Sequence, residues 1–316
     1  MSRLRVVCLV GPTASGKSAL GLELAERLGG EIVSADSRQV YRGLDIGTAK
    51  PTPAERARVP HHGLDLVEPG DSFDAARFTA VAAAAIADVC RRGRPPFVVG
   101  GTGLYVRALL HGLCPAPPRV PALRAALGHL VAERGAPAVH RGLAALDPVA
   151  ASRIGPNDAV RIVRALEVGI ATGRRLSAWQ AAHRFAGSAY DALVIGLGRP
   201  VPELDARIAR RAREMVAAGF RDEVAALCAR GVPADAPGLR TVGYAEMRAW
   251  SEGRLADDVA LAALVRATRG FAKRQRTWFR HEPDVLWRHP ERDRARLADE
   301  VGTFLARGVR PAPAAA

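Results

Sequence analysis

The sequence predicts an α/β protein with a P-loop NTPase-like parallel sheet flanked by helices, and with a helical insertion domain. Three observations lead to this class. Short β-branched runs alternate with helical segments over residues 1–115, a glycine-rich loop joins the first run to the first helix, and residues 116–190 read as an almost purely helical stretch before a strand returns. Strands separated by helices of this length form right-handed parallel βαβ units.

The first 115 residues are predicted to form the first part of the core. Strands are expected at 5–10 (RVVCLV), 31–36 (EIVSAD) and 95–101 (PPFVVGG), and helices at 17–28 and 78–90. The apolar run at 5–10 is too short for a signal-peptide core or a membrane span, so it is expected to be a buried strand. The four cysteines form no CxxC pair, which indicates neither a zinc site nor a disulfide framework. We therefore expect a cytoplasmic protein without a membrane partner.

The elements after residue 113 are predicted from the positions of proline, the hydrophobic periodicity and the composition. The proline-rich run CPAPPRVP at 114–121 is expected to be a hinge, followed by helices from 122 to 183. A strand is predicted at 192–199, and helices at 203–218, 221–230 and 257–280 complete the core within residues 191–300. Residues 301–316, which end in ARGVRPAPAAA, are of low complexity and are expected to form a disordered tail.

The charge balance indicates a polyanionic partner. The chain has 46 Lys and Arg against 32 Asp and Glu, a net charge of +14 at pH 7. Residues 1–115 carry about +3, residues 116–195 about +5 and residues 196–316 about +6. A basic surface of this kind is typical of nucleic-acid binding, although an Arg- and Ala-rich genome composition is an alternative explanation.

A P-loop is the most specific local motif. The pattern GxxxxGK[ST] is matched by Gly11, Pro12, Thr13, Ala14, Ser15, Gly16, Lys17 and Ser18. It lies between an apolar strand and a helix, so its backbone N–H groups and the positive end of the helix can hold phosphate oxygens. Lys17 would add a point charge and Ser18 a hydroxyl ligand for Mg²⁺. The alternative is an ordinary glycine-rich turn.

The other strand ends suggest which chemistry the loop serves. Kinases and ATPases of this class carry a metal-binding acid after a second apolar strand, but the strand ending at Val99 runs into Gly100, Gly101 and Thr102. Ligands of open parallel sheets lie beyond the carboxyl ends of the strands, so Asp36 and Thr102 are expected to face the P-loop. Asp36 is then a candidate base or metal ligand, or alternatively a turn-forming Asp.

Several segments together resemble bacterial tRNA dimethylallyltransferases, also called tRNA isopentenyltransferases. They are GPTASGKS, ADSRQVYRGLDIGTAKP at 35–51, PHHGLD at 60–65, VVGGTGLYVRALL at 98–110, NDAVRIVRALEV at 157–168, RIARRAREM at 207–215 and FAKRQRTWFR at 271–280. The resemblance covers roughly residues 5–285, and the segment after the second strand is far more specific than the P-loop.

The resemblance implies transfer of a dimethylallyl group from dimethylallyl diphosphate to the exocyclic amine of the adenosine immediately 3′ of the anticodon in tRNA, with pyrophosphate released. Asp36 matches the catalytic carboxylate of the family, which would accept the proton of a weakly nucleophilic amine. Lys17 and Thr102 would also be catalytic, and Mg²⁺ would stabilise the leaving diphosphate. Arg207 and Arg211 resemble a basic helix that would clamp pyrophosphate, or they form a solvated face. The family suggests a monomer.

The resemblance also assigns contacts to the tRNA anticodon stem-loop, with the helical insertion as a clamp. The positions are Asp36, Ser37, Arg38, Gln39, Thr102, Arg124, Val160, Arg161, Ile162, Val163, Arg164, Arg240, Thr241, Val242 and Gly243.

A basic ladder gives an independent indication of RNA binding. At 100° per residue, one arc of about 80° holds Arg266, Arg269, Lys273, Arg276 and Arg280. Three aromatic residues at 271, 278 and 279 lie on the other side and are expected to pack the core. No acid occurs between 266 and 280, so the ladder reads as unpaired and suited to a phosphate backbone, or as a solvated face.

Three other functions remain open from the sequence. A relative that prenylates free adenine nucleotides would leave the insertion and the ladder without a purpose. A P-loop small-molecule kinase is disfavoured by the missing acid after Val99. A non-catalytic RNA-binding module would leave Asp36 and the P-loop unexplained.

Overall fold

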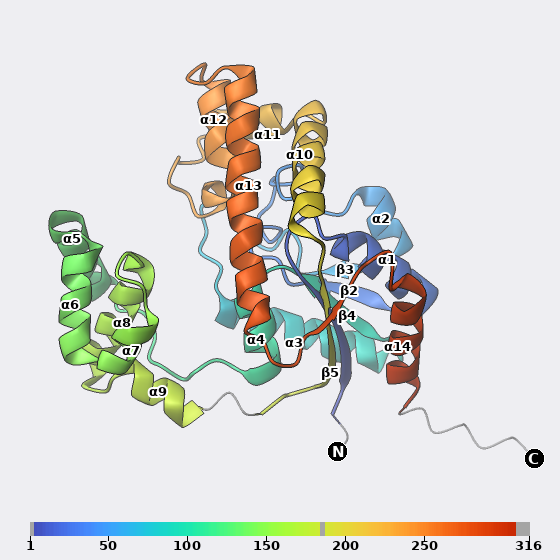
Figure 1. The fold of residues 1–316 in the computed structure, drawn as a ribbon, viewed down its shortest axis with the longest axis horizontal. Helices are drawn as coiled ribbons and strands as arrows, with labels where there is room; N and C mark the ends of the chain where they lie inside the picture. The colour runs from blue at the N-terminus through green and yellow to red at the C-terminus, as the bar shows by residue number, and fades with distance from the viewer. Residues whose placement is uncertain (1–2, 184–186, 308–316) are drawn as a thin grey trace, which may run out of the picture. The chain divides into compact units, whose positions relative to one another are not determined.

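The computed structural model describes residues 3–183 and 187–307, and within them the chain builds one parallel six-stranded sheet (Figure 1). The strands are β1 (Arg5–Val10), β2 (Glu31–Ser34), β3 (His61–His62), β4 (Pro96–Gly100), β5 (Asp191–Leu197) and β6 (Leu286–Arg288). Their order is β3-β2-β4-β1-β5-β6, and all five pairings are parallel. The predicted parallel α/β class is confirmed. The short edge strands β3 and β6 were not predicted.

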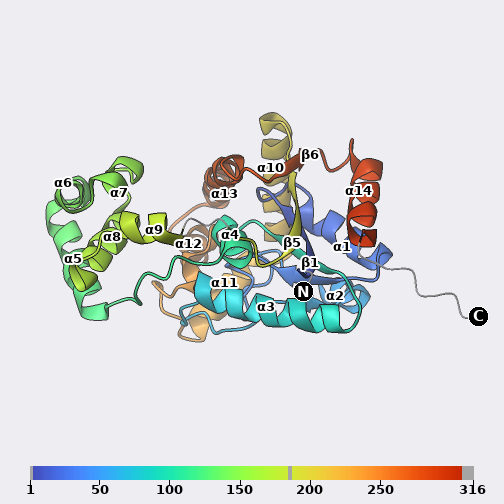
Figure 2. The same cartoon turned by 90° about the horizontal axis from the view of Figure 1, so that it is seen from below.

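Helices cover both faces of the sheet. Figure 2 shows α1 (Lys17–Arg27) and α14 (Arg294–Ala306) on one side of the strands and α3 (Ala75–Arg91) on the other. Alternate β1 residues such as Val7 and Leu9 pack with α1 and α14 in one apolar cluster, as expected for strands buried on both faces. Asp74 caps α3 by accepting hydrogen bonds from two backbone N–H groups of its first turn. The short helix α4 (Gly103–His111) follows β4.

The last helix corrects the prediction of a tail from residue 301. Leu297 and Val301 of α14 are fully buried against the leucines of α1, so residues 301–306 continue a helix that packs on the core. The apolar face of α14 was obscured in the sequence by the alanine- and proline-rich run that follows it. The remainder of the predicted tail, from residue 308, lies outside the described residues.

Further helices follow β5 and pack over the loop after β2. They are α10 (Val201–Ala217), α11 (Phe220–Ala229), α12 (Tyr244–Ser251) and α13 (Asp257–Arg280), with a short 3₁₀ turn at Gly238–Arg240 before α12. Phe220, Tyr244 and Leu264 share an apolar cluster with Val40 and Leu44 of that loop, and α2 (Pro53–Arg58) lies further along the same connection. These contacts fix the loop beside the carboxyl ends of the strands.

By its contacts the chain divides into two compact units, one formed by residues up to 110 and from 188 onward, the other by residues 111–187. The second unit contains α5 (Pro121–Arg134), α6 (Ala136–Leu146), α7 (Pro148–Arg153), α8 (Ala159–Thr172) and α9 (Leu176–His183). It has a core of its own, in which Leu143 and Ile162 are fully buried. Among the described helices, none has the length and apolar character needed to cross a bilayer.

Candidate active site

The P-loop is curled by residues with positive φ. Gly11 has φ +143°, Ala14 φ 62° and Gly16 φ +101°, so glycine supplies the unusual backbone at two of the three positions. A Cβ atom on Gly11 would lie 2.7 Å from the carbonyl oxygen of Leu197 in β5, which leaves no room for a side chain. The curl places the loop at the N-terminus of α1, where backbone N–H groups and the helix dipole favour an anion.

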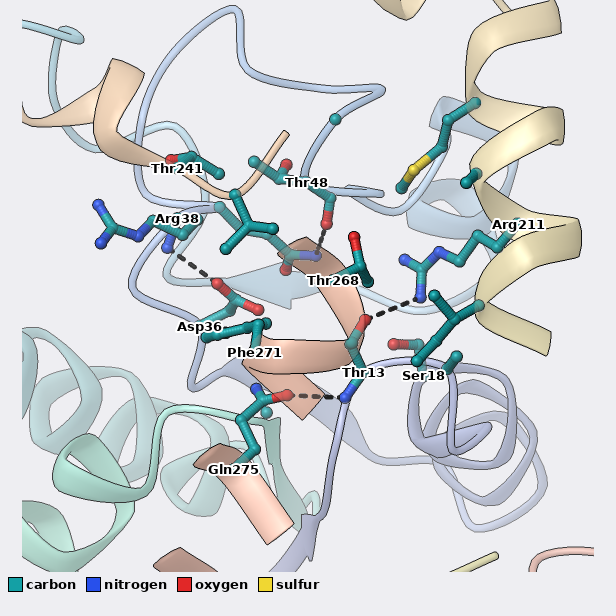
Figure 3. Close-up of a pocket in the computed structure, with 18 of the residues that line it drawn as sticks. Thr13, Ser18, Asp36, Arg38, Thr48, Arg211, Thr241, Thr268, Phe271 and Gln275 are labelled. Carbon is teal, nitrogen blue, oxygen red and sulfur yellow. Dashed lines mark hydrogen bonds between the residues drawn. The ribbon is translucent and has the colours of Figure 1, made fainter. Parts of the chain in front are cut away.

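A cavity of about 320 Å³ opens above this loop. Figure 3 shows Thr13, Ser18 and Arg211 on one side of it and Asp36, Arg38 and Thr241 on the other. The lining also includes Lys17 and Gln39, the loop residues Gly47 and Thr48, Arg240 and Val242, the α10 residues Ile208, Ala212 and Met215, and the α13 residues Leu264, Thr268, Phe271, Arg274 and Gln275. The predicted meeting of the P-loop with the end of β2 is therefore present in the structure.

Two half-buried cations, Lys17 and Arg211, line the P-loop side of the cavity. Burial lowers the pKa of Lys17 to about 8, and the nearby Asp36 opposes this shift. Burial also lowers the pKa of Arg211, again opposed by Asp36. The ammonium of Lys17 donates to the carbonyl oxygen of Pro12 at 3.3 Å. Desolvated positive charges of this kind interact strongly with an incoming diphosphate.

The turn that carries Asp36 is held from β4. Asp36 Oδ1 accepts a hydrogen bond from the backbone N–H of Arg38 at 2.8 Å. Thr102 Oγ1 accepts from the backbone N–H of Ser37 at 2.9 Å, and its hydroxyl donates to the Ser37 hydroxyl at 3.3 Å. Thr102 thus fixes the residue next to the carboxylate, so Asp36 and Thr102 lie together as the strand ends predicted.

Arginines from the second half of the chain hold the P-loop backbone. Arg207 Nε donates to the carbonyl oxygen of Ala14 at 2.9 Å, and an Arg211 terminal nitrogen lies 3.5 Å from Thr13 Oγ1. Arg199 Nε donates to the carbonyl oxygen of Ser15 at 3.0 Å and pairs with two glutamates. Arg199 was not predicted as a site residue, although it lies two residues after the end of β5 and the strand-end criterion would have included it.

Two residues that the sequence analysis did not single out shape the cavity wall. The carboxylate of Glu223 accepts from the backbone N–H groups of residues 45, 46 and 47 at 2.8, 2.6 and 3.2 Å, and from the Tyr244 hydroxyl at 2.7 Å. Gln275 of α13 bonds the P-loop at Thr13 (Figure 3). Gln275 lies within the segment 271–280 that carries the family resemblance, but the sequence does not indicate which groups Gln275 and Glu223 bind, because those groups are distant along the chain.

The predicted tRNA-contact residues near the cavity have several partners within the protein. An Arg38 terminal nitrogen donates to the carbonyl oxygen of Pro237 at 3.1 Å. Gln39 Nε2 donates to the carbonyl oxygens of Thr48 and Ala49 at 3.2 and 3.0 Å, so its amide braces the loop. Arg240 is exposed, and Gly243, which precedes α12, has φ +94°. RNA contact at these positions stays a prediction.

In the separate helical unit, the predicted contact residues divide into two groups. Arg124 and Arg164 both bind the buried Glu167, at 2.9 and 2.8 Å, and Arg161 pairs with Asp158. Val160 is 74% exposed. Ile162 and Val163 are buried in the core of this unit, so a contact to RNA at these two positions would have to use the backbone.

The basic ladder of α13 is only partly as predicted. Arg266, Lys273 and Arg280 are exposed and Arg276 is half-buried. Arg269 is paired with Asp205 of α10 at 3.4 Å, so the prediction of an unpaired ladder is wrong at this position. The acid belongs to another helix, so the sequence of residues 266–280 does not contain it. On the other side of α13, Phe279 is buried in the core as expected, whereas Phe271 lines the cavity.

Comparison with known proteins identifies the family of this chain. The IPP transferase family model matches residues 39–282, and an isopentenyl transferase model matches residues 4–60. The tRNA dimethylallyltransferase of Anaeromyxobacter dehalogenans (strain 2CP-1 / ATCC BAA-258) is 55% identical over 298 residues, which cover 94% of this chain and 97% of that protein. The chain belongs to the tRNA dimethylallyltransferase family.

Solved structures of this family share the fold. The full-length tRNA isopentenylpyrophosphate transferase of Bacillus halodurans matches with a TM-score of 0.69 at 38% identity, covering 95% of this chain and 96% of that one. A eukaryotic dimethylallyltransferase acting on tRNA matches with a TM-score of 0.81 over 98% of this chain and 81% of its own. At 24% identity, the second match concerns the fold alone.

Proposed function

We propose that this protein transfers a dimethylallyl group from dimethylallyl diphosphate to the exocyclic amine of the adenosine immediately 3′ of the anticodon in tRNA. The observation that carries the proposal is the cavity itself, which has Lys17 and Arg211 beside the P-loop and the carboxylate of Asp36 on the opposite side. This arrangement suits a reaction in which an anionic leaving group departs on one side and a proton is removed on the other. Membership of the dimethylallyltransferase family supports it.

Different cavity residues serve the two bond changes of the proposed reaction. The amine nitrogen attacks the first carbon of the dimethylallyl group, a C–N bond forms, and the C–O bond to the diphosphate breaks. The amine proton passes to Asp36, and the negative charge that develops on pyrophosphate meets the P-loop N–H groups, Lys17 and Arg211. The partial burial of both cations strengthens this interaction.

A magnesium ion fits the oxygen donors of the cavity. The Ser18 hydroxyl, in the first turn of α1, and the Asp36 carboxylate both line it. Mg²⁺ is usually held by one or two protein oxygens together with substrate phosphates and water, so no larger set of protein ligands is required. When bound, the ion would supply positive charge to the diphosphate oxygens, while Ser18 would hold it at the start of α1.

The basic surface supplies the proposed contacts to tRNA. The exposed cations of α13 and the basic insertion suit a phosphate backbone, and a flipped adenine would enter beside Asp36 and Thr241. Prenylation of a free nucleotide would leave these cations without a role.

The proposal is tested by supplying the purified protein with Mg²⁺ and dimethylallyl diphosphate, and with tRNA, AMP or ATP in separate reactions. Nucleosides are then released and weighed. The expected result is one added prenyl group on the adenosine 3′ of the anticodon, with AMP and ATP unmodified. Prenylated AMP with unmodified tRNA would indicate the free-nucleotide reaction, and phosphate release from ATP without prenylation would indicate a kinase or ATPase.

A further inference from the structure

Gln275 joins two parts of the cavity that are distant in sequence. Its side chain projects from α13 and is almost completely buried, with 7% exposure. Gln275 Oε1 accepts a hydrogen bond from the backbone N–H of Thr13 at 2.8 Å (Figure 3), and Nε2 donates to the carbonyl oxygen of Gly101 at 3.0 Å. One amide therefore bridges the P-loop and the end of β4, using one donor and one acceptor.

Each end of the bridge leads to a different reacting group. On one side, Thr13 lies in the P-loop, and Arg211 also approaches its hydroxyl. On the other side, Gly101 precedes Thr102, whose hydroxyl holds the backbone of Ser37 next to Asp36. A continuous set of contacts thus runs from the diphosphate loop through the amide to the turn that carries the carboxylate.

The packing around the amide leaves it little freedom. A Cβ atom on Gly101 would lie 2.2 Å from Gln275 Nε2 and 3.2 Å from the carbonyl oxygen of Gly11. Glycine at 101 is therefore what allows the amide to lie between the two backbones. A buried amide with both hydrogen bonds made is costly to displace, because each backbone group that it leaves would be unpaired.

We propose that Gln275 is a positioning residue that sets the separation between the diphosphate-binding loop and the Asp36 turn. The inference rests on the proposed transfer reaction. In that reaction the first carbon of the dimethylallyl group must be in line with the adenosine amine nitrogen that attacks it and with the diphosphate oxygen that leaves. Misplacement of reacting groups by about 1 Å can cost on the order of 10²-fold in rate. Gln275 itself touches neither reacting atom in this scheme and acts through Thr13 and Gly101.

The test separates alignment from binding. In Gln275→Met, a side chain of similar length makes neither hydrogen bond. We expect the single-turnover rate of tRNA prenylation to fall about 10²-fold, while the KM for dimethylallyl diphosphate and the Kd for tRNA change less than about threefold. Thr79→Val serves as the control, since the Thr79 hydroxyl bonds only its own helix, at Ala75, and this variant should match the wild type in rate.

A second variant changes the packing around the Gln275 amide at Gly101. Gly101→Ala would displace Gln275 by its Cβ atom, so it should reproduce the rate loss, and combining Gly101→Ala with Gln275→Ala should cost little more than either change alone. An unchanged rate in folded Gln275→Met protein would overturn the inference. A rate loss in Gln275→Met that is accompanied by a comparable loss of substrate affinity and by a lower melting temperature would also overturn it. So would rate losses of Gly101→Ala and Gln275→Ala that are fully additive in the double variant. A wild-type protein without prenylation activity would refute the proposed function instead.

Discussion

At the residue scale, the carboxylate of Asp36 is the group in the cavity suited to accept the amine proton. We expect Asp36→Asn, which keeps the size of the side chain, to lower kcat by roughly 10²–10⁴-fold. Affinity for tRNA should change little, because the proposed phosphate contacts lie elsewhere. Single-turnover prenylation and tRNA binding by filter retention measure the two effects. If turnover is unchanged in Asp36→Asn, Asp36 is not the base. If the variant loses tRNA binding but turns over bound tRNA at the normal rate, Asp36 serves in tRNA recognition.

Lys17 gives the protein a pH dependence with a defined sign. Its pKa in the free protein is lowered to about 8 by burial, so the side chain is charged below pH 8 and loses its proton above it. Binding a diphosphate favours the charged form. Affinity for dimethylallyl diphosphate should therefore be constant below pH 8 and fall as the pH rises through 8, by up to about tenfold per unit.

Calorimetric titration from pH 6.5 to 9.5 measures this dependence of Lys17. Lys17→Arg is the matched control, since a guanidinium stays charged over this range. Both proteins bind the same ligand, so any effect of ligand titration cancels in the ratio of the dissociation constants of the wild type and Lys17→Arg. A ratio that does not change between pH 7 and 9.5 would contradict the prediction.

At the element scale, α13 combines a cavity face with a charged face. Lys273 is exposed on the charged face, whereas Arg269 is held by Asp205. We expect Lys273→Gln to weaken tRNA binding and to reduce the slope of log affinity against log salt concentration by about 1, without changing the KM for the diphosphate. Arg269→Gln should reduce the slope less. Equal slopes for the wild type and Lys273→Gln would exclude this face from the RNA interface.

Glu167 of α8 holds the start of the helical unit. It accepts hydrogen bonds from Arg124, Arg164 and the backbone N–H of Val120, the residue that precedes α5. Burial acts to raise the pKa of Glu167, but these hydrogen bonds outweigh it and lower the pKa from 4.5 to about 2. The two arginines, predicted from resemblance to contact tRNA, thus also have a structural partner.

Replacing Glu167 by Gln should destabilise this unit by roughly 1.5–3 kcal/mol. Because the folded-state pKa is lowered, the stabilisation by Glu167 is fully present above about pH 4.5 and is lost as the pH falls toward 2. The protection factors of residues 117–124, which compare the hydrogen-exchange rate with the intrinsic rate at the same pH, should be low in the variant at pH 7 and at pH 3.5. In the wild type they should fall only at pH 3.5. The control is Glu133→Gln, an exposed glutamate in the same unit. Wild-type protection in Glu167→Gln would contradict this account.

At the scale of the whole molecule, the two ends of the chain share one core. Leu297 near the C-terminus is fully buried with Leu9 of β1 and Leu24 of α1. We expect Leu297→Ala to lower the free energy of unfolding by roughly 2–5 kcal/mol, as measured by urea denaturation. Leu104→Ala, at a position that is 46% exposed, should stay within about 0.5 kcal/mol of the wild type. A similar small effect at Leu297 would mean that α14 adds little to the core.

Much of this molecule was predictable because the relevant signals are local. The P-loop is contiguous, the β-branched runs of β1 and β4 are short and apolar, and the helical run at 257–280 matches α13 to the residue. Parallel strands bring their carboxyl ends to one edge, so the meeting of Asp36 with the P-loop also followed from the order of the segments. Thr102 bonds the turn that carries Asp36 but is not among the residues that line the cavity.

The residues that hold these parts in place could not be predicted, because they bind segments that are distant along the chain. Gln275, Arg199 and Glu223 bind backbone groups whose positions are more than 170 residues away, and no spacing along the chain marks such partners. The same reason explains the pairing of Arg269 with an acid of α10 and the burial of α14. The P-loop motif, the position of the Asp36 carboxylate and the alternation of strands with helices could be predicted from the sequence, because they depend on neighbouring residues. Contacts between distant segments decided how the loop and the carboxylate are held relative to each other, because hydrogen bonding and burial depend on separation in space.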